Sequence, residues 1–248
     1  MRRLLLPTIG LLLAACASTP PPTDKPIEPV PADQPLVVSY EAPEDPLAGF
    51  NRAVFAFNDV TYRWLLVPAA RGYLWLPSPV RDSVGKLFGN LRSPVSAVNH
   101  LLQLDPAGSG RNLLRFTINS TLGLAGLFDP AAAWFGIEAE PTGFADTLAR
   151  YGSGHGAYLV LPIFGSSDFR SAPGLVVDAL LHPLPYLIGE PESTLLRGFD
   201  SFQQLAPEAE NYVELRGRSD DPYAFFRDLH LQGLQRDDQF PAEAPADD

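Results

Sequence analysis

Cysteine is almost absent from this sequence, because Cys16 is the only one in 248 residues. A disulfide framework is therefore excluded, and stability must come from an ordinary packed core. Long uncharged apolar runs are also missing, since no later segment reaches the ~18 residues of a membrane-spanning helix. Basic residues are scarce, with 18 Lys and Arg against 29 Asp and Glu and a formal net charge of −11. This balance argues against nucleic acid or an anionic surface bound through bulk charge.

Residues that could build a catalytic or metal-binding site are few and scattered. Ser153 and His155 lie close together in a glycine-rich run, but no strand precedes them and the Gly-x-Ser-x-Gly pattern of a hydrolase nucleophile is not formed. The histidines have no mutual spacing suited to zinc; they are His100, His155, His182 and His230. The sequence therefore predicts no catalytic residue, no metal and no cofactor.

The N-terminus has the pattern of an exported lipoprotein. It begins with Arg2 and Arg3, continues with a short apolar stretch and ends in Leu-Ala-Ala before Cys16. This ending is typical of a bacterial lipobox, in which a peptidase cuts before the cysteine and the cysteine is acylated; a plain secretory signal with a free thiol is the alternative. We expect residues 1–15 to be a signal peptide and Cys16 to be the lipid attachment site that anchors the chain. No aspartate follows the cysteine to mark retention in the inner membrane, which favours the outer membrane.

Composition divides the rest of the chain into three parts. Residues 16–44 hold the lipidated cysteine and a linker with eight prolines and little apolar content, so we expect this part to be extended. Residues 237–248 form an acidic tail that we expect to be disordered. The folded, helical domain is therefore predicted to span residues 45–236.

A helix-start pattern recurs through the folded region. Asp or Ser at an N-cap accepts a free backbone N–H, and a following proline has no N–H to lose. Six such pairs occur: Asp45-Pro46, Ser78-Pro79, Ser93-Pro94, Asp105-Pro106, Asp129-Pro130 and Asp221-Pro222. Glycines interrupt residues 137–165, where only Tyr158–Leu161 resembles a strand. The pattern predicts an all-α fold of short amphipathic helices with an irregular, glycine-rich central segment.

The first predicted helix, from Asp45 to about Leu65, is apolar over more than a core-facing stripe. Aromatic side chains spread around more than one of its faces, so we expect it to lie in or against lipid. The candidate lipid-facing residues are Phe50, Asn51, Phe55, Phe57 and Trp64. A fully buried core helix is the alternative.

Several blocks of this region resemble one known family. In chain order they include Asp45-Pro46-Leu47-Ala48-Gly49-Phe50-Asn51-Arg52, Phe57-Asn58, Pro68-Ala69-Ala70-Arg71-Gly72-Tyr73, Asn90-Leu91-Arg92-Ser93-Pro94, Arg115-Phe116-Thr117-Ile118-Asn119-Ser120-Thr121-Leu122-Gly123, Tyr158-Leu159-Val160-Leu161-Pro162 and Asp221-Pro222-Tyr223. Together they are similar to the VacJ/MlaA lipoproteins over nearly all of the folded region. Ala149, Ala157, Ser166 and Ser171 depart from the family pattern in or near the central segment.

The resemblance implies a transport role and no enzymatic activity. Such proteins form a ring-like array of amphipathic helices in the inner, periplasmic leaflet of the outer membrane, around a central channel. They remove mislocalised phospholipids from the outer leaflet and pass them to a periplasmic phospholipid carrier protein, and an outer-membrane trimeric porin binds them from the side. Helices in one leaflet satisfy their own backbone groups, as lipid requires.

The glycine-rich segment is the candidate lining of this channel. We expect its aromatic rings and close-packed backbone to line or constrict the lipid passage, with Arg150 or His155 meeting a phosphate head group. The candidate channel residues are Arg150, Tyr151, Gly152, Gly154, His155 and Tyr158. Two other classes of function remain open, a periplasmic scaffold lipoprotein with a water-soluble core and a lipid hydrolase.

Overall fold

The computed structural model describes residues 45–239 of the chain. The predicted signal peptide, the lipid attachment site Cys16, the linker and the tail from residue 240 onward lie outside the described residues. The last helix continues to Gln239, past the predicted domain end at residue 236.

Helices make up most of the described region, as the all-α prediction requires, and one small hairpin accompanies them. The elements are α1 (Ala48–Thr61), η1 (Tyr62–Leu66, a π-helix), α2 (Val67–Leu74), α3 (Ser78–Leu102), α4 (Pro106–Thr121), α5 (Pro130–Phe135), α6 (Phe144–Arg150), β1 (Tyr158–Leu161), β2 (Gly165–Asp168), α7 (Ser171–Leu181), α8 (Leu184–Ile188), α9 (Glu192–Leu205), η2 (Ala206–Glu208, a 3₁₀-helix), α10 (Ala209–Gly217) and α11 (Pro222–Gln239).

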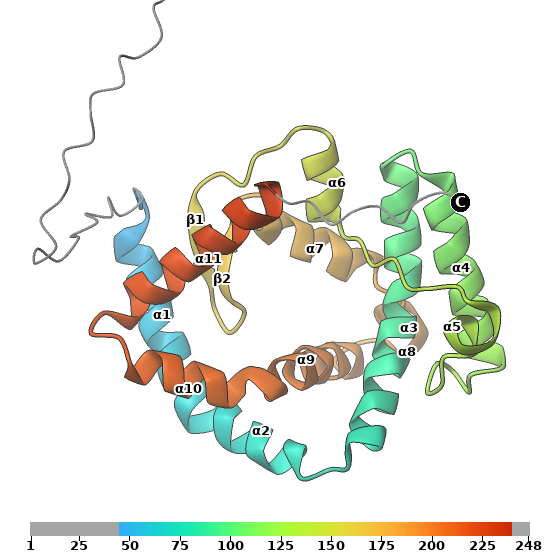
Figure 1. The fold of residues 1–248 in the computed structure, drawn as a ribbon, viewed down its shortest axis with the longest axis horizontal. Coiled ribbons are helices and arrows are strands. Elements are labelled where there is room, and N and C mark those ends of the chain that lie inside the picture. The colour runs from blue at the N-terminus through green and yellow to red at the C-terminus, as the bar shows by residue number, and fades with distance from the viewer. Residues whose placement is uncertain (1–44, 240–248) are drawn as a thin grey trace, which may run out of the picture. The chain divides into compact units, whose positions relative to one another are not determined.

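The helices and the hairpin of residues 45–239 are arranged in a ring (Figure 1). Going around it, α3 contacts α6, α6 contacts α7, and α7 contacts β2. The ring continues from β2 to α11, α10 and α2, and α9 closes it against α3. α4 packs on the outer side of α3, α5 contacts α4, and the hairpin turn between β1 and β2 lies inside the ring (Figure 1).

Three of the predicted helix starts carry the expected cap. The carboxylate of Asp105 accepts the Gly108 N–H at 2.9 Å at the start of α4. Asp129 and Asp221 do the same for residues three positions further on, at 3.2 Å each, at the starts of α5 and α11. These caps work because each carboxylate satisfies a backbone donor that has no partner within its helix.

The prediction of a helix start at Ser93-Pro94 is wrong. α3 runs unbroken from Ser78 to Leu102 with Pro94 inside it. An internal proline costs about 3 kcal/mol in a helix because it removes one backbone hydrogen bond and crowds the preceding turn. The long contact of α3 with α4 compensates, since packing along a whole helix outweighs one local preference.

Residues 137–165 are more regular than their glycines indicated. They contain α6, whose first turn is held by Asp146 accepting the Gly143 N–H at 2.8 Å. The helix fits because it lies between glycines and contains none. The predicted strand at Tyr158–Leu161 is confirmed as β1, and β2 pairs with it antiparallel, with Tyr158 opposite Asp168 and Leu161 opposite Gly165.

Polar and apolar side chains are distributed in the reverse of the order found in a water-soluble protein. Among the described residues, nineteen buried ones are polar or charged and only eleven are hydrophobic, whereas thirty-four large hydrophobic side chains are exposed. Trp64, Trp75 and Trp134 are 77%, 90% and 68% exposed. The interior is therefore held largely by hydrogen bonds, and the outer surface is suited to an apolar solvent. None of the helices in residues 45–239 has the length and apolarity to cross a bilayer.

Candidate functional site

Two Phe-Asn pairs on α1 hold the hairpin in place. The amide of Asn51 accepts the Val160 N–H at 2.9 Å and donates to the Tyr158 carbonyl at 3.1 Å. Two helical turns further on, Asn58 accepts the Ile163 N–H at 2.7 Å and donates to the Leu161 carbonyl at 2.8 Å. Each side-chain amide therefore pairs with the backbone of the hairpin as a neighbouring strand would.

The two aromatic neighbours of these asparagines point the other way. Phe50 and Phe57 are about half exposed, while Asn51 is fully buried. The prediction that Asn51 faces lipid is therefore wrong, because its amide is used by the hairpin backbone. Phe55 is partly buried, with its ring 5.8 Å from the Tyr223 ring, and its contact with lipid stays a prediction. Contact of Phe50, Phe57 and Trp64 with lipid stays a prediction that their exposure supports.

Tyr158 is not available to a passing ligand. Its side chain is buried with Val160 and Tyr223 in the small apolar core where the hairpin meets α11. Its hydroxyl lies 2.9 Å from the Ser166 hydroxyl on the opposite strand. The prediction that Tyr158 lines the channel is therefore wrong, since in strand β1 its position points to the α11 side.

Two of the other candidates in the glycine-rich segment contact the C-terminal end of α3. Arg150 Nε donates to the Gln103 carbonyl at 2.9 Å, and the Tyr151 hydroxyl donates to the Leu102 carbonyl at 2.6 Å. Gly152 has φ of 85°, which explains the glycine. Gly154 is exposed and has open space around it. Arg150 and Tyr151 therefore bind carbonyl groups at the end of α3. The role of all four residues in a channel stays a prediction.

His155 belongs to a compact charged cluster. Its Nδ1 lies 3.3 Å from Asp168 Oδ2, and its Nε2 lies 3.2 Å from the Arg170 guanidinium. Burial raises the pKa of Asp168, but hydrogen bonds from Ser171 and from the Arg170 N–H outweigh it and hold the pKa below its usual value. Among the described residues no hydrogen bond joins Ser153 to His155; the Ser153 hydroxyl is directed to the Gly154 carbonyl. The geometry does not assemble a serine hydrolase.

A large apolar cavity opens between the hairpin turn and helices α7, α8 and α9. Its volume is about 720 Å³. The lining residues are Leu161, Pro162, Phe164, Ala172, Leu175, Val176, Ala179, Leu180, Pro185, Tyr186, Glu190 and Arg197. None of the six channel candidates from the sequence lines it. The sequence analysis named no residue of α7 as a candidate, although α7 supplies five of the lining residues.

One ion pair forms the polar part of this cavity. Arg197 Nη2 lies 3.1 Å from Glu190 Oε1, and Arg197 Nη1 donates to the Ala179 carbonyl at 3.1 Å. The remaining lining is hydrocarbon or aromatic except for the Tyr186 hydroxyl, which donates to the Leu180 carbonyl at 2.7 Å. Such a cavity can accept an amphipathic molecule, with hydrocarbon against α7 and a charged group near the ion pair. Within residues 45–239 no group of three acidic, His or Cys side chains could hold a metal.

Comparison with known proteins adds independent findings. A sequence profile described as MlaA lipoprotein matches residues 43–237. The intermembrane phospholipid transport system lipoprotein MlaA of Haemophilus influenzae is 35% identical over 195 residues, which cover 77% of this chain and 78% of that protein. The protein of the same name from Escherichia coli K12 is 33% identical over 195 residues, with 76% of each chain covered. A solved structure from work on the maintenance of bacterial outer membrane lipid asymmetry is 32% identical and aligns with a TM-score of 0.65, covering 77% of this chain and 98% of the other.

Proposed function

This chain belongs to the MlaA lipoprotein family, and on that premise we propose that it is an outer-membrane lipoprotein of an intermembrane phospholipid transport system. It removes mislocalised phospholipids from the outer leaflet and passes them toward the periplasm. The ligand leaves chemically unchanged, so the protein is not an enzyme. This function maintains the lipid asymmetry of the outer membrane.

The reversed distribution of side chains is the observation that carries the proposal. Thirty-four exposed large hydrophobic residues would be costly in water, at about 25 cal/mol for each Å² of apolar surface. Five of them line the α7 cavity, namely Phe164, Leu175, Val176, Leu180 and Tyr186. The others are stabilised when the ring lies within the periplasmic leaflet, with its apolar outer surface against acyl chains. Tryptophan is enriched at the boundary between lipid and water, which fits the exposure of Trp64, Trp75 and Trp134. A water-soluble scaffold would instead bury these side chains.

The cavity beside the hairpin turn is the proposed passage for the lipid. Acyl chains would lie against Leu175, Val176 and Leu180 on α7, and the head group would lie near the Arg197–Glu190 ion pair. A pair of opposite charges suits a zwitterionic head group. The volume of about 720 Å³ accommodates part of a phospholipid at one time, as expected for a passage and not for a storage site.

The transport role requires partners at both ends of the path. We propose a soluble periplasmic carrier protein that accepts the phospholipid and a trimeric porin that holds the ring in the outer membrane. We propose that an acylated Cys16 anchors the chain in the membrane.

The decisive experiment removes the protein from its own bacterium and measures phospholipid in the outer leaflet with a membrane-impermeant amine label. The outer-leaflet phospholipid is expected to rise and to return to normal when the gene is restored. Restoration by the doubly substituted Ser153→Ala, His155→Ala chain separates transport from hydrolysis, since a hydrolase would lose its function. An unchanged outer leaflet in the deletion strain would refute the proposal.

A further inference from the structure

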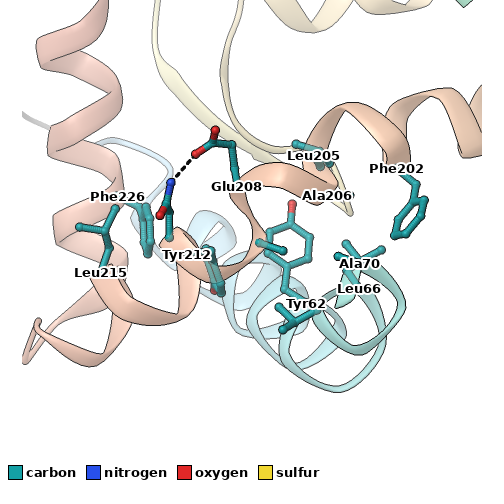
Figure 2. A pocket seen from close by; sticks show the side chains of 13 residues that line it. Tyr62, Leu66, Ala70, Phe202, Leu205, Ala206, Glu208, Tyr212, Leu215 and Phe226 are labelled. Carbon is teal, nitrogen blue, oxygen red and sulfur yellow. Dashed lines mark hydrogen bonds between the residues drawn. The ribbon is translucent and has the colours of Figure 1, made fainter. Parts of the chain in front are cut away.

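A second, smaller pocket lies where η1 and α2 meet α9, η2, α10 and α11 (Figure 2). Its volume is about 260 Å³. Three rings form one wall: Tyr62 lies edge-on to Tyr212 at 5.2 Å, and Tyr212 stacks on Phe226 at 5.0 Å. The remaining lining residues are Leu66, Val67, Ala70, Phe202, Leu205, Ala206, Glu208, Ala209, Asn211 and Leu215. None of them lines the larger cavity.

Most of the polar side-chain atoms of this lining are already paired. The Tyr62 hydroxyl donates to the Ile163 carbonyl, and the Tyr212 hydroxyl donates to Asp59 Oδ1 at 2.9 Å. Asn211 donates to Glu208 Oε2 at 2.6 Å, the bond drawn in Figure 2. No Lys or Arg lines the pocket. The two polar side chains that keep a free oxygen, Glu208 and Asn211, are exposed, and the rest of the lining selects hydrocarbon.

The size of the pocket suits a single alkyl chain. An apolar cavity of about 150 Å³ holds one benzene ring, so about 260 Å³ holds on the order of ten carbon atoms. A two-chain lipid with its head group does not fit. The pocket is therefore of the right size for most of one acyl chain, with the rest of the lipid outside.

Exposed apolar side chains belong to this pocket or are next to it in the sequence. Leu205 lines it and is 45% exposed. The π-helix η1 contributes Tyr62 and Leu66 to the lining, while the intervening Trp64 and Leu65 are 77% and 63% exposed. A π-helical turn is rare and occurs frequently at functional sites, because it widens the backbone and redirects the side chains on either side.

We propose that this pocket holds one acyl chain of a phospholipid from the surrounding leaflet as a resident lipid, separate from the lipid in transit. The inference rests on the proposed position of the ring within the leaflet. The resident chain fills the gap between α2 and α10, which the Arg71–Glu210 ion pair bridges at 2.6 Å.

The test uses the full-length, lipidated protein in lipid nanodiscs that contain a phosphatidylethanolamine with a photoreactive diazirine near the middle of one chain. Illumination followed by peptide mapping is expected to give adducts on η1, η2 and α10. Ala209→Phe fills the pocket from α10 and should lower these adducts about tenfold. Ala69→Phe, on the exposed side of α2, adds the same ring outside the pocket and should leave them unchanged.

Two further arms keep the result unambiguous. Leu205→Gln changes a half-exposed lining position without filling the pocket and should also lower the adducts, which covers the case that Ala209→Phe does not fold. Cys16→Ala should leave them unchanged; their loss in that variant would mean that the chain's own anchor occupies the pocket and would overturn the proposal. Adducts on α7 alone would leave the transport proposal standing and refute the resident lipid, whereas adducts at neither place would refute both.

Discussion

Asp59 on α1 and Arg216 on α10, which are 157 positions apart in the sequence, form a bidentate ion pair, with Nε 2.6 Å from Oδ1 and Nη2 3.2 Å from Oδ2. Arg63 lies 2.8 Å from the same carboxylate, and the Tyr212 hydroxyl donates to it at 2.9 Å. Burial raises the pKa of Asp59, but the hydrogen bonds from Arg216 and Tyr212 and the two positive charges outweigh it and lower the pKa. This carboxylate therefore ties the start of the ring to its last part.

Acid is expected to weaken this tie. Because the pKa of Asp59 is lower in the folded protein, ionisation favours folding at pH values above the unfolded pKa of about 3.9, and this contribution is lost as the pH falls through the folded pKa. Asp59→Asn should lower the free energy of unfolding at pH 7 by about 2 kcal/mol and flatten its decline below about pH 4. Denaturant titrations in detergent between pH 3 and 7 measure both effects. Glu214→Gln, which breaks the exposed pair with Arg218, is the control and should change neither.

The two asparagines of α1 should dominate the stability of the hairpin. Asn51→Ala or Asn58→Ala removes two hydrogen bonds to the backbone of β1 and the turn after it, which should cost about 2–4 kcal/mol each. Asn51→Ala also removes a bond to Asp45 Oδ1. Hydrogen exchange at the Val160 and Ile163 amides should accelerate in the respective variant. Phe57→Ala, beside Asn58 but with an exposed ring, should leave both amides protected; equal acceleration there would show that α1 as a whole, and not the amide, holds the hairpin.

Lipidation is expected at Cys16 and nowhere else, since the chain has no other cysteine. Cys16→Ala should leave an uncleaved or mis-sorted precursor because the peptidase and the acyl transfer both require the thiol. Intact-mass analysis of the native protein measures the modification directly. A mature native chain with an unmodified Cys16 would contradict the anchor.

Trp64 provides a direct measure of lipid contact, because its side chain is 77% exposed. With Trp75 and Trp134 replaced by Phe, its fluorescence in a membrane-bound sample should be quenched by lipids that carry a quencher on the acyl chain. The reference is the same variant, with Trp64 as its one tryptophan, in detergent without quencher. Fluorescence that is insensitive to these lipids would favour the reading of α1 and η1 as core helices.

Lipid transfer should depend on the cavity lined by α7. Val176→Asp places a charge where acyl chains are proposed to pass, and it should reduce transfer to the periplasmic carrier at least about tenfold, while its 61% exposure lets the variant fold. Gly154→Trp, which meets open space away from this cavity, is the matched variant. Normal transfer by the Gly154→Trp variant supports the α7 cavity as the lipid passage. Impaired transfer by Gly154→Trp together with normal transfer by Val176→Asp would place the passage at the glycine-rich segment instead.

Local signals in the sequence were the ones that predicted structure correctly. The caps at Asp105, Asp129 and Asp221 act within three residues, so their chemistry is visible in the sequence itself. Pro94 has the same local signal as these caps, yet distant packing of α3 against α4 decides its outcome. Sequence alone does not report that contact.

The candidate site was harder to predict, because both the contacts of Asn51 and the lining of the α7 cavity depend on residues that are distant in the sequence. Asn51 is polar within an apolar helix, and its burial follows only once strand β1 is known to lie beside it, 109 positions away. The α7 cavity is built from ordinary apolar residues, whose exposure is a property of the ring and not of any motif. The family resemblance supplied the ring, which periodicity alone did not reveal.

The hydrogen bonds from Asn51 and Asn58 to the hairpin backbone have a further consequence for how copies of this protein meet. A strand at the edge of a two-stranded sheet presents unpaired N–H and C=O groups, which can recruit a strand from another molecule and start aggregation. In β1 and the turn after it, Asn51 and Asn58 occupy four of these groups. The hairpin is thus closed to strand exchange on this edge, and many copies can crowd together in a membrane without joining into a continuous sheet.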